Sequence, residues 1–455
     1  MYKLYPYFTN DGSVGLFSPD ADDIYHSTSG ALSEAYEKFI LPANFQNFFQ
    51  KNSDIKILDI CFGIGYNSKS FLNNFLDILY NETIGTDNIK YNDKIGDDNK
   101  NNKKQNISCH SEPKNIMRSF AALRMTKGEE SHKNFKIFIK AIDTDKNLAG
   151  LSPFFIADKK IVKDNKLSFE QDKIRKLLST NAKPKYKFRK EVNILLLEKL
   201  INLIDNDVED ILTDKNYSQF FDGFMVDFYR IKKNERINNT PLRRLNAFLH
   251  NIYYKYISTS HKNALKALKL LDFNFEIKID DARKVIQEDK NLYDFVFLDA
   301  FTATKCPCLW TVDFFKALYE HLQDGGMILT YSNSAQVRHA FLEAGFWVGK
   351  NVFDGKSIGT VAVKITVRQT SPLAGEGADV SELANVTPAG EGSILSQFPK
   401  ISPLSQYDLG LLKTKAGIFY RDENLNLPNE AIIAAHRKEV ENSTLMSSSK
   451  YKKMQ

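Results

Sequence analysis

The sequence is poor in cysteine and tryptophan and contains no long apolar run. Its 455 residues include four cysteines, whose spacing fits no familiar zinc site. Cys306 and Cys308 are separated only by Pro307, which is too close for a relaxed disulfide. No stretch approaches the roughly 20 apolar residues of a membrane-spanning helix, and the first residues lack the apolar core of an export signal. We therefore expect a cytoplasmic protein with no metal site and no membrane partner.

The charge balance is only mildly basic. Lysine and arginine number 62 against 56 aspartates and glutamates, so the formal net charge is +6. Such an excess permits a nucleic-acid partner without requiring one. The length and the 42% of hydrophobic residues are sufficient for a sizeable core and for two or more domains.

A glycine turn follows an early apolar run. The segment IKILDICFGIGYNSKSFL, residues 55–72, predicts a strand, a tight turn and a helix. Gly63 and Gly65 allow the backbone to approach a ligand closely, and the start of the helix offers free N–H groups. Asp59, at the end of the strand, can accept hydrogen bonds from an ammonium or a hydroxyl. A dinucleotide enzyme would need G-x-G-x-x-G, which the sequence after Gly65 does not continue.

Acidic residues end three later predicted strands. Asp143, with Asp145 as an alternative, ends FKIFIKAID; Asp281 follows the strand at 273–279; and Asp299 follows the short buried run FVFL. The carboxyl ends of parallel strands meet at one edge of a sheet, where ligands bind. An acid at the end of the second strand commonly accepts from ribose hydroxyls. The pattern predicts an α/β protein with a Rossmann-like sheet.

Composition divides the chain further. We expect N-terminal strands and a substrate-side loop at 1–50, the first half of the main domain at 51–82 and 133–160, a low-complexity insertion at 83–132, a helical, basic insertion at 161–270, the second half of the domain at 271–369, a flexible insertion at 370–405, a docked C-terminal segment at 406–446 and a disordered tail at 447–455.

Two stretches combine basic and aromatic residues, KPKYKFRK at 183–190 and RRLNAFLHNIYYKYISTSHK at 243–262. Neighbouring cations and ring faces suit a single-stranded RNA loop. A helical face that packs its aromatics inward and leaves its lysines in solvent would produce the same pattern. Both interpretations stay open.

Four separated blocks carry a resemblance to a known family: DGSVGLFSPDADDIYHSTSGALSE, LDICFGIGYN, YDFVFLDAFTATKCPCLWT with the following Gly325-Gly326 and EAGF, and LGLLKTKAGIFYRDENL. They resemble the MnmC methyltransferases, the tRNA 5-methylaminomethyl(-2-thio)uridine enzymes, in the stand-alone form without the FAD-dependent oxidoreductase domain. The third block is the most specific, because Asp-x-Phe-x-x-x-Lys-x-Pro-x-x-Trp-Thr is far richer than a glycine turn. With the strands between them, the blocks cover about half of the chain, and the low-complexity insertions lie outside.

The resemblance implies a Rossmann-like methyltransferase fold and the cofactor S-adenosyl-L-methionine. The implied reaction methylates the primary amine of 5-aminomethyl(-2-thio)uridine at the wobble position of tRNA. A separate oxidoreductase or the aminomethyluridine-forming complex would supply the substrate. The implied roles are catalysis by Asp299; cofactor binding by Asp59, Gly63, Gly65, Asn67, Asp143 and Asp281; and, less directly, substrate contact by Tyr25, His26, Phe301, Lys305 and Trp310.

The sequence departs from the family pattern at two positions. Cys61 stands where the family's glycine turn usually begins with glycine, and Asp143 stands where the second strand usually ends in glutamate. Two other functions remain alternatives. A polyamine aminopropyltransferase would have Gly-Gly-Gly-Asp-Gly after the first strand, where this chain has FGIG. A non-catalytic RNA-binding protein would keep the basic stretches and lack the cofactor site.

Overall fold

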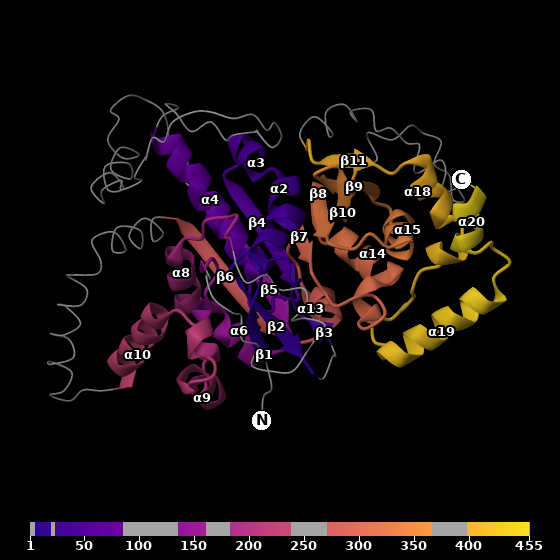
Figure 1. Ribbon diagram of the computed structural model, residues 1–455. Coiled ribbons are helices and arrows are strands. Elements are labelled where there is room, and N and C mark those ends of the chain that lie inside the picture. The colour runs from indigo at the N-terminus through magenta and orange to yellow at the C-terminus, as the bar shows by residue number, and fades with distance from the viewer. Residues whose placement is uncertain are drawn as a thin grey trace, which may run out of the picture.

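An eight-stranded sheet forms the centre of the structure, a computed structural model that describes residues 5–19, 23–84, 135–160, 183–237, 271–365 and 398–454 (Figure 1). Its strands lie in the order β11-β9-β10-β8-β7-β4-β5-β6. Strands β4 to β8 are mutually parallel, and β10, β9 and β11 extend the sheet in antiparallel fashion. The strands are β4 Asp54–Ile60, β5 Lys136–Asp143, β6 Asp272–Ile279, β7 Tyr293–Leu298, β8 Leu322–Thr330, β9 Trp347–Phe353, β10 Lys356–Val363 and β11 Ile401–Pro403. The predicted Rossmann-like sheet is confirmed.

The strand order reverses beside β4. The chain passes from β4 through β5 to β6 on one side, and β7 and β8 then extend the other side. At such a switch point the loops that leave the carboxyl ends diverge and leave a crevice between them. Asp59 pairs in register with Phe297, and the Asp299 N–H donates to the Ile60 carbonyl at 3.3 Å. The ends of β4 and β7 therefore place two of the predicted acids at this crevice.

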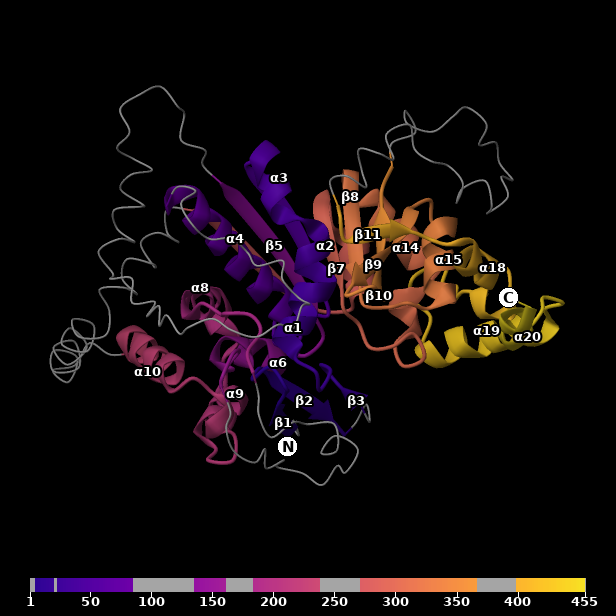
Figure 2. The ribbon, with the colours of Figure 1, turned by 45° about the horizontal axis from the view of Figure 1, so that its top comes forward.

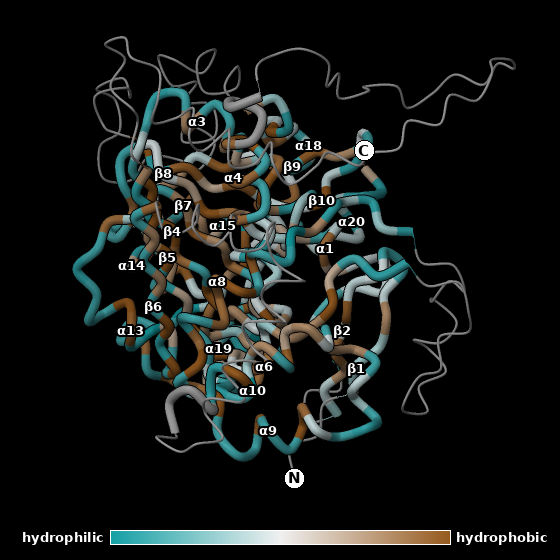
Figure 3. The backbone as a smooth tube through the Cα atoms, turned by 90° about the vertical axis from the view of Figure 1, so that its left-hand side faces the viewer, coloured by the Kyte–Doolittle hydropathy of each residue, from teal (hydrophilic) through white to brown (hydrophobic). Residues whose placement is uncertain are grey.

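Alternate residues of each central strand face opposite sides of the sheet. Ile57 and Phe297 belong to one apolar cluster, whereas Leu58 and Leu298 belong to the other. Because both faces are covered, the central strands are largely apolar, which Figure 3 shows as brown segments in β4, β5 and β7. The first cluster is completed by α1 Ala31–Ala35, the π-helix η1 Tyr36–Ile40, α2 Leu41–Ala43, α3 Phe45–Lys51, α4 Tyr66–Ile84 and α6 Lys146–Leu151. The second is completed by α13 Ala282–Glu288, η5 Pro307–Trp310, α14 Val312–Glu320, α15 Ala335–Glu343, α18 Gln406–Leu412 and α19 Asn429–Asn442 (Figure 2).

A small sheet of β1 Tyr5–Phe8, β2 Val14–Ser18 and β3 Asp23–Ile24 lies beside the large one (Figure 1). Asp11, in the turn between β1 and β2, ties this sheet to α1. Its Oδ1 accepts from Thr9 Oγ1 at 2.8 Å and from the Ser13 N–H at 3.0 Å, and its Oδ2 accepts from the Ser33 N–H at 2.7 Å. The turn thus satisfies a free N–H in the first turn of α1 and fixes the path of the chain that follows β3.

Helices α8 Lys190–Leu200, α9 Asn206–Thr213 and α10 Gly223–Ile237, with the short helices η2 Ser152–Phe154, η3 Ile201–Leu203 and η4 Ser218–Phe220, extend the first cluster. They lie where the sequence predicts a helical insertion. The basic stretch before α8 is packed inward. Tyr186 stacks on Tyr36 with ring centroids 4.3 Å apart, Phe188 is buried, and Arg189 pairs with Asp77 at 2.6 Å. For residues 183–190 the structure therefore supports the packed-face interpretation; residues 243–262 lie outside the described residues.

Two predictions for the C-terminal region are wrong. Strand β11 falls within the predicted flexible insertion at 370–405, because Ile401, Ser402 and Pro403 pair with β9. Residues Ser448–Met454 form helix α20, where a disordered tail was expected, and Tyr451 packs against Tyr407 at a centroid distance of 5.7 Å. Composition did not reveal either contact because both partners are distant in sequence. The 3-10 helix η7, Lys415–Gly417, lies between α18 and α19.

No helix within the described ranges has both the length and the apolar character that crossing a membrane requires.

We predict that Asp11→Ala destabilises the protein. Asp11 is 4% exposed, and its loss leaves several buried donors without their acceptor. The expected decrease in the free energy of unfolding is about 2–4 kcal/mol. Differential scanning calorimetry measures the change, with Asp210→Ala, an exposed acid on α9, as the control. Equal melting temperatures for the two variants would contradict the role of Asp11.

Candidate functional site

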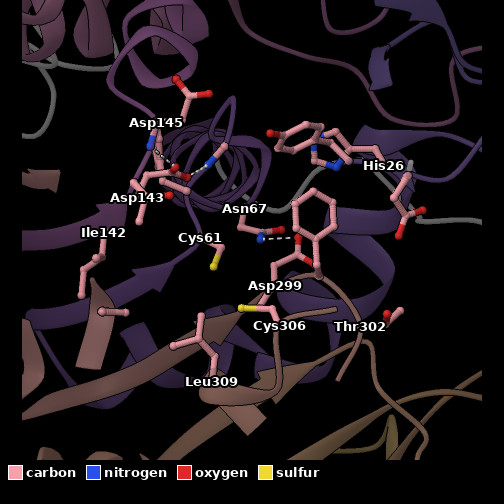
Figure 4. Close-up of a pocket in the computed structure, with 18 of the residues that line it drawn as sticks. His26, Cys61, Asn67, Ile142, Asp143, Asp145, Asp299, Thr302, Cys306 and Leu309 are labelled. Atoms are coloured by element: carbon pink, nitrogen blue, oxygen red, sulfur yellow. Dashed lines mark hydrogen bonds between the residues drawn. The ribbon is translucent and has the colours of Figure 1, made fainter. Parts of the chain in front are cut away.

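A cavity of about 450 Å³ opens at the carboxyl ends of β4, β5 and β7 (Figure 4). This volume is ordinary for a small-molecule pocket. None of the described side chains that line it is a lysine or an arginine. The acidic residues that line it are Asp23, Glu34, Asp143, Asp145, Asp280, Asp281 and Asp299. Such a lining favours a cationic ligand and disfavours a phosphate.

The glycine turn between β4 and α4 forms one wall. Gly63 and Gly65 have φ angles of +55° and +76°, which glycine adopts without strain. The Gly63 N–H donates to Asp143 Oδ2 at 2.6 Å. Gly65 faces away from the cavity, since a Cβ there would lie 2.5 Å from the Phe62 ring. Gly63 can therefore contact a ligand directly, whereas Gly65 allows the turn to pack.

Asp59 lies beneath the cavity and is completely buried. Its Oδ2 accepts from Ser68 Oγ at 2.6 Å and from the Ser68 N–H at 3.2 Å. Its Oδ1 has no hydrogen-bond partner among the described residues. Burial raises the pKa of this carboxyl to about 7. An acceptor that is buried and unsatisfied in this way is suited to a donor on a bound molecule.

Asp143 and Asp145 lie at the end of β5. Asp143 binds the glycine turn with one oxygen and accepts from the Asp145 N–H at 2.8 Å with the other. Asp145 caps α6 by accepting from the Leu148 N–H at 2.9 Å. Both side chains line the cavity, and burial raises the pKa of Asp143 to about 6. Of the two, Asp143 is the one joined to the glycine turn.

Asp299 lies across the cavity from this wall (Figure 4). Its Oδ2 accepts from Asn67 Nδ2 at 3.0 Å, so the predicted cofactor residue Asn67 holds the predicted catalytic residue. Burial, and then the negative charge of Glu34, raise the pKa of Asp299 to about 6. A carboxyl with such a pKa can exchange a proton near neutral pH.

The predicted substrate residues fall into two groups. Tyr25, His26 and Phe301 line the cavity, and the Tyr25 and Phe301 ring centroids are 5.1 Å apart. Burial lowers the pKa of His26 to about 4, so its ring is neutral at pH 7, and its Nε2 has no hydrogen-bond partner among the described residues. Lys305 pairs with Asp23 at 3.1 Å, and the buried Trp310 donates from Nε1 to the Phe301 carbonyl at 2.8 Å. Lys305 and Trp310 stabilise the loop that follows β7 and do not line the cavity.

Most of the predicted site residues come together. Those on the cavity surface are Tyr25, His26, Gly63, Asn67, Asp143, Asp281, Asp299 and Phe301. Those beneath or beside it are Asp59, Gly65, Lys305 and Trp310. Asp281 is the N-cap of α13, and its carboxylate is bound by Arg283.

Sequence reasoning missed Glu34 and Tyr331. Glu34 lines the cavity from α1, where its carboxylate pairs with the ammonium of Lys38 and accepts from the Ser27 N–H at 3.1 Å. Tyr331 follows β8 directly, and its hydroxyl donates to the Ala300 carbonyl at 2.9 Å. The position of Tyr331 after a parallel strand was a usable signal, because it is the position that Asp299 has after β7. For Glu34, an acid on a short helix gave no such signal.

Cys61, at the start of the glycine turn, has a φ angle of +64°. This left-handed conformation costs a residue with a Cβ about 1–2 kcal/mol relative to glycine. The side chain lines the cavity, and burial raises the pKa of its thiol. The backbone therefore keeps the glycine-type conformation although the residue is a cysteine.

We predict that Cys61→Gly is more stable than Cys61→Ala by about 1 kcal/mol. Both variants lose the thiol and its contacts, but only glycine relieves the left-handed strain. Denaturant unfolding of the two variants measures the difference. At most positions in a chain, alanine is a more stabilising replacement than glycine. If Cys61→Ala were the more stable variant here too, the left-handed strain would be absent.

We predict that Asp59 makes stability depend on pH. Its pKa of about 7 in the folded protein exceeds that of an ordinary aspartate, so the folded state binds the proton more tightly. Its stabilising contribution is complete below the unfolded pKa of about 4 and is lost as the pH rises through about 7. From pH 5 to about 8, the melting temperature of the wild type should therefore fall relative to that of Asp59→Asn. The control Asp324→Asn, an exposed acid at the start of β8, should follow the wild type; parallel curves for Asp59→Asn and the wild type would refute the assignment.

Comparisons with known proteins identify a family model, a relative and a solved structure. Residues 243–365 match a family model described as S-adenosyl-L-methionine-dependent methyltransferase. Over 92 residues the chain is 35% identical to an uncharacterized protein of Methanocaldococcus jannaschii, which covers 20% of this chain and 26% of that protein. The chain thus matches about a quarter of the length of this relative. The crystal structure of MnmC2 from Aquifex aeolicus is similar with a TM-score of 0.48 and 17% identity, over 97% of this chain and 87% of that one.

The family match covers β6 to β10, the half of the sheet that contributes Asp281 and Asp299 to the cavity. The glycine turn, the switch point beside β4 and the terminal hairpin complete the arrangement. The chain therefore has a Rossmann-like S-adenosyl-L-methionine-dependent methyltransferase fold, and S-adenosyl-L-methionine is its cofactor.

Proposed function

We propose that the protein transfers the methyl group of S-adenosyl-L-methionine to the primary amine of 5-aminomethyl(-2-thio)uridine at the wobble position of tRNA. The observation that carries the proposal is the half-buried carboxylate of Asp299 on the surface of a cavity that contains no lysine or arginine among its described lining. Such a cavity accepts a cationic amine and keeps phosphates outside. The choice of the uridine as substrate rests on the resemblance of the block around Asp299 to the MnmC methyltransferases.

The residues present fit the cofactor. S-adenosyl-L-methionine carries an ammonium and a sulfonium, and the acidic lining complements both. The unsatisfied Oδ1 of Asp59 is available to a donor at the end of β4. Asp59, Gly63 and Asn67 would hold the methionine portion, Asp143 the ribose and Asp281 the adenine. The sulfonium is an activated methyl donor, so this chemistry needs no metal.

Asp299 would act on the substrate amine. An ammonium has no lone pair and must lose a proton before it attacks a methyl group. A half-buried carboxylate with a pKa of about 6 can orient the amine and accept or relay that proton. Asn67 keeps the carboxylate in one orientation through its 3.0 Å hydrogen bond. Tyr25 and Phe301 would bound the uridine, and the neutral His26 beside them adds no positive charge to repel the amine.

The tRNA surface is proposed from the resemblance and from the two basic stretches of the sequence. In residues 183–190, Tyr186 stacks on Tyr36 and Phe188 is buried, so this stretch could contact phosphates through its exposed lysines but not stack a base on these rings. Residues 243–262 lie outside the described residues and stay a candidate from their sequence. We also propose that the protein acts in the cytoplasm, on a substrate prepared by an oxidoreductase or by the aminomethyluridine-forming complex.

A polyamine aminopropyltransferase is the second candidate. The same acidic lining would suit a flexible polyamine with several ammonium groups. A purely RNA-binding role would leave the cofactor without a use.

The decisive assay incubates the protein with S-adenosyl-L-methionine and tRNA that contains 5-aminomethyluridine, followed by digestion and mass spectrometry of the nucleosides. A gain of one methyl group on that uridine is expected. An unchanged uridine, together with aminopropylated putrescine or spermidine in a parallel reaction that contains decarboxylated S-adenosyl-L-methionine, would transfer the assignment to the polyamine enzyme.

We predict that Asp299→Asn lowers kcat by about 10²–10⁴-fold and leaves the affinity for S-adenosyl-L-methionine within about threefold. The wild-type kcat/KM should fall as the pH decreases through about 6, because protonated Asp299 cannot accept a proton. Single-turnover kinetics and calorimetric titration measure the two effects, with Asp324→Asn as the acid-to-amide control. Parallel loss of rate and cofactor affinity would assign Asp299 to cofactor binding.

A further inference from the structure

Asp281 is held by an arginine that a distant segment fixes. Arg283 Nη2 lies 2.7 Å from Asp281 Oδ2, and Arg283 Nη1 lies 2.8 Å from Asp422 Oδ2. Nη1 also donates to the Leu427 carbonyl at 2.8 Å. The Arg283 side chain is 11% exposed and that of Asp422 is 0% exposed. One buried guanidinium thus joins a cavity residue to the C-terminal region.

Asp422 forms hydrogen bonds through both of its carboxylate oxygens and through its backbone N–H. Its Oδ1 accepts from the Asn426 N–H at 3.0 Å and from the Leu427 N–H at 3.1 Å. Its own N–H donates to Asp313 Oδ2, on α14, at 2.6 Å. With both oxygens and the amide engaged, Asp422 presents a fixed charge to Arg283.

The same segment also contacts a second element that lines the cavity. Asn429 Oδ1 accepts from the N–H of Cys308, which lines the cavity, at 3.3 Å. The Tyr420 carbonyl accepts from the Val312 N–H at 3.1 Å. Residues 420–429, which we term the C-terminal brace, therefore connect α13 to η5, two elements that contribute lining residues.

Asp281 retains the capacity for one more donor. Arg283 donates to Oδ1 from its N–H at 2.9 Å and to Oδ2 from Nη2 at 2.7 Å, and its Nε lies 3.2 Å from both oxygens. These contacts come from three donors, and an ionised carboxylate has about four acceptor sites, so it can accept from one more donor. The side chain is 41% exposed, and it lines the cavity. The free site can accept from an amino group and repels a carbonyl oxygen.

We propose that the C-terminal brace is a positioning element of the cofactor site, in which Asp422 and Arg283 orient Asp281 to select an amino group on the nucleobase. The proposal rests on the assignment of Asp281 to the adenine. It makes Arg283 and Asp422 positioning residues, because neither lines the cavity. Their loss should affect the choice of base more than the binding of the methionine portion.

The experiment compares the dissociation constants of S-adenosylhomocysteine and S-inosylhomocysteine by calorimetric titration of the full chain. The inosyl compound has an oxygen in place of the amino group. We expect the wild type to prefer the adenosyl compound by about tenfold or more, because the charged acceptor would lose its donor and face a carbonyl oxygen instead. Arg283→Lys, which lacks the planar fork, and Asp422→Asn should reduce the preference to about threefold or less.

The ratio of the two constants is insensitive to partial unfolding. Both ligands bind the same folded fraction, so a less stable variant weakens both constants by the same factor. The matched controls are Arg421→Lys and Glu423→Gln, which change exposed neighbours in the brace and should retain the wild-type ratio.

The possible outcomes distinguish the positioning role of the C-terminal brace from the adenine contact of Asp281. A wild-type preference that Asp281→Asn abolishes but Arg283→Lys and Asp422→Asn leave intact would overturn the role of the brace and preserve the adenine contact. A wild-type ratio near one would overturn both. A reduced ratio in the two brace variants with unchanged controls supports the proposal.

Discussion

Mutual repulsion among carboxylates is the constraint on which the site depends. Seven acidic side chains line one cavity, and none of the described lysines and arginines that pair with them lines it. Lys38 pairs with Glu34, Arg283 with Asp281, Lys284 with Asp280 and Lys305 with Asp23. Asp143 and Asp299 instead accept from the Gly63 N–H and from Asn67, and their pKa values rise to about 6. Neither Asp143 nor Asp299 forms an ion pair among the described residues, so a cationic ligand would supply the missing positive charge.

The sequence was sufficient for the central strands and for the acids that end them, because both signals are local. Runs such as FVFL followed by Asp299 show a buried strand and its carboxyl end without any knowledge of the partners. Contacts between distant segments were out of reach. Asp59 and Asp299 were correctly placed at one edge, but the bond between Asn67 and Asp299 joins residues 232 positions apart and left no trace in either neighbourhood.

Because contacts between distant segments cannot be read from the sequence, the order of the C-terminal segments was predicted wrongly and the role of the basic stretch at 183–190 stayed open. Helix α20 and strand β11 are ordered by partners that composition does not reveal. The stretch KPKYKFRK has the composition of an RNA-binding segment, yet Tyr186 stacks on Tyr36 and Arg189 pairs with Asp77. Cations and aromatics side by side are equally what a surface-to-core boundary requires, since the ring is buried and the charge stays at the rim. Only tertiary contacts distinguish the two cases.

The direction of the strands has a consequence for how such a chain can change in length. Strands β5 and β6 begin, and the antiparallel β10 ends, at the edge of the sheet opposite the cavity, as the pairing of Val363 with Met327 at the start of the apolar part of β8 indicates. The long connections that precede β5 and β6 and follow β10 therefore join the domain at that edge. Extra residues there cost little, because the entropy of closing a loop grows only slowly with its length. A lineage carrying this fold can thus lengthen or shorten these connections freely while the opposite edge, with its acids in register, stays under strict geometric control.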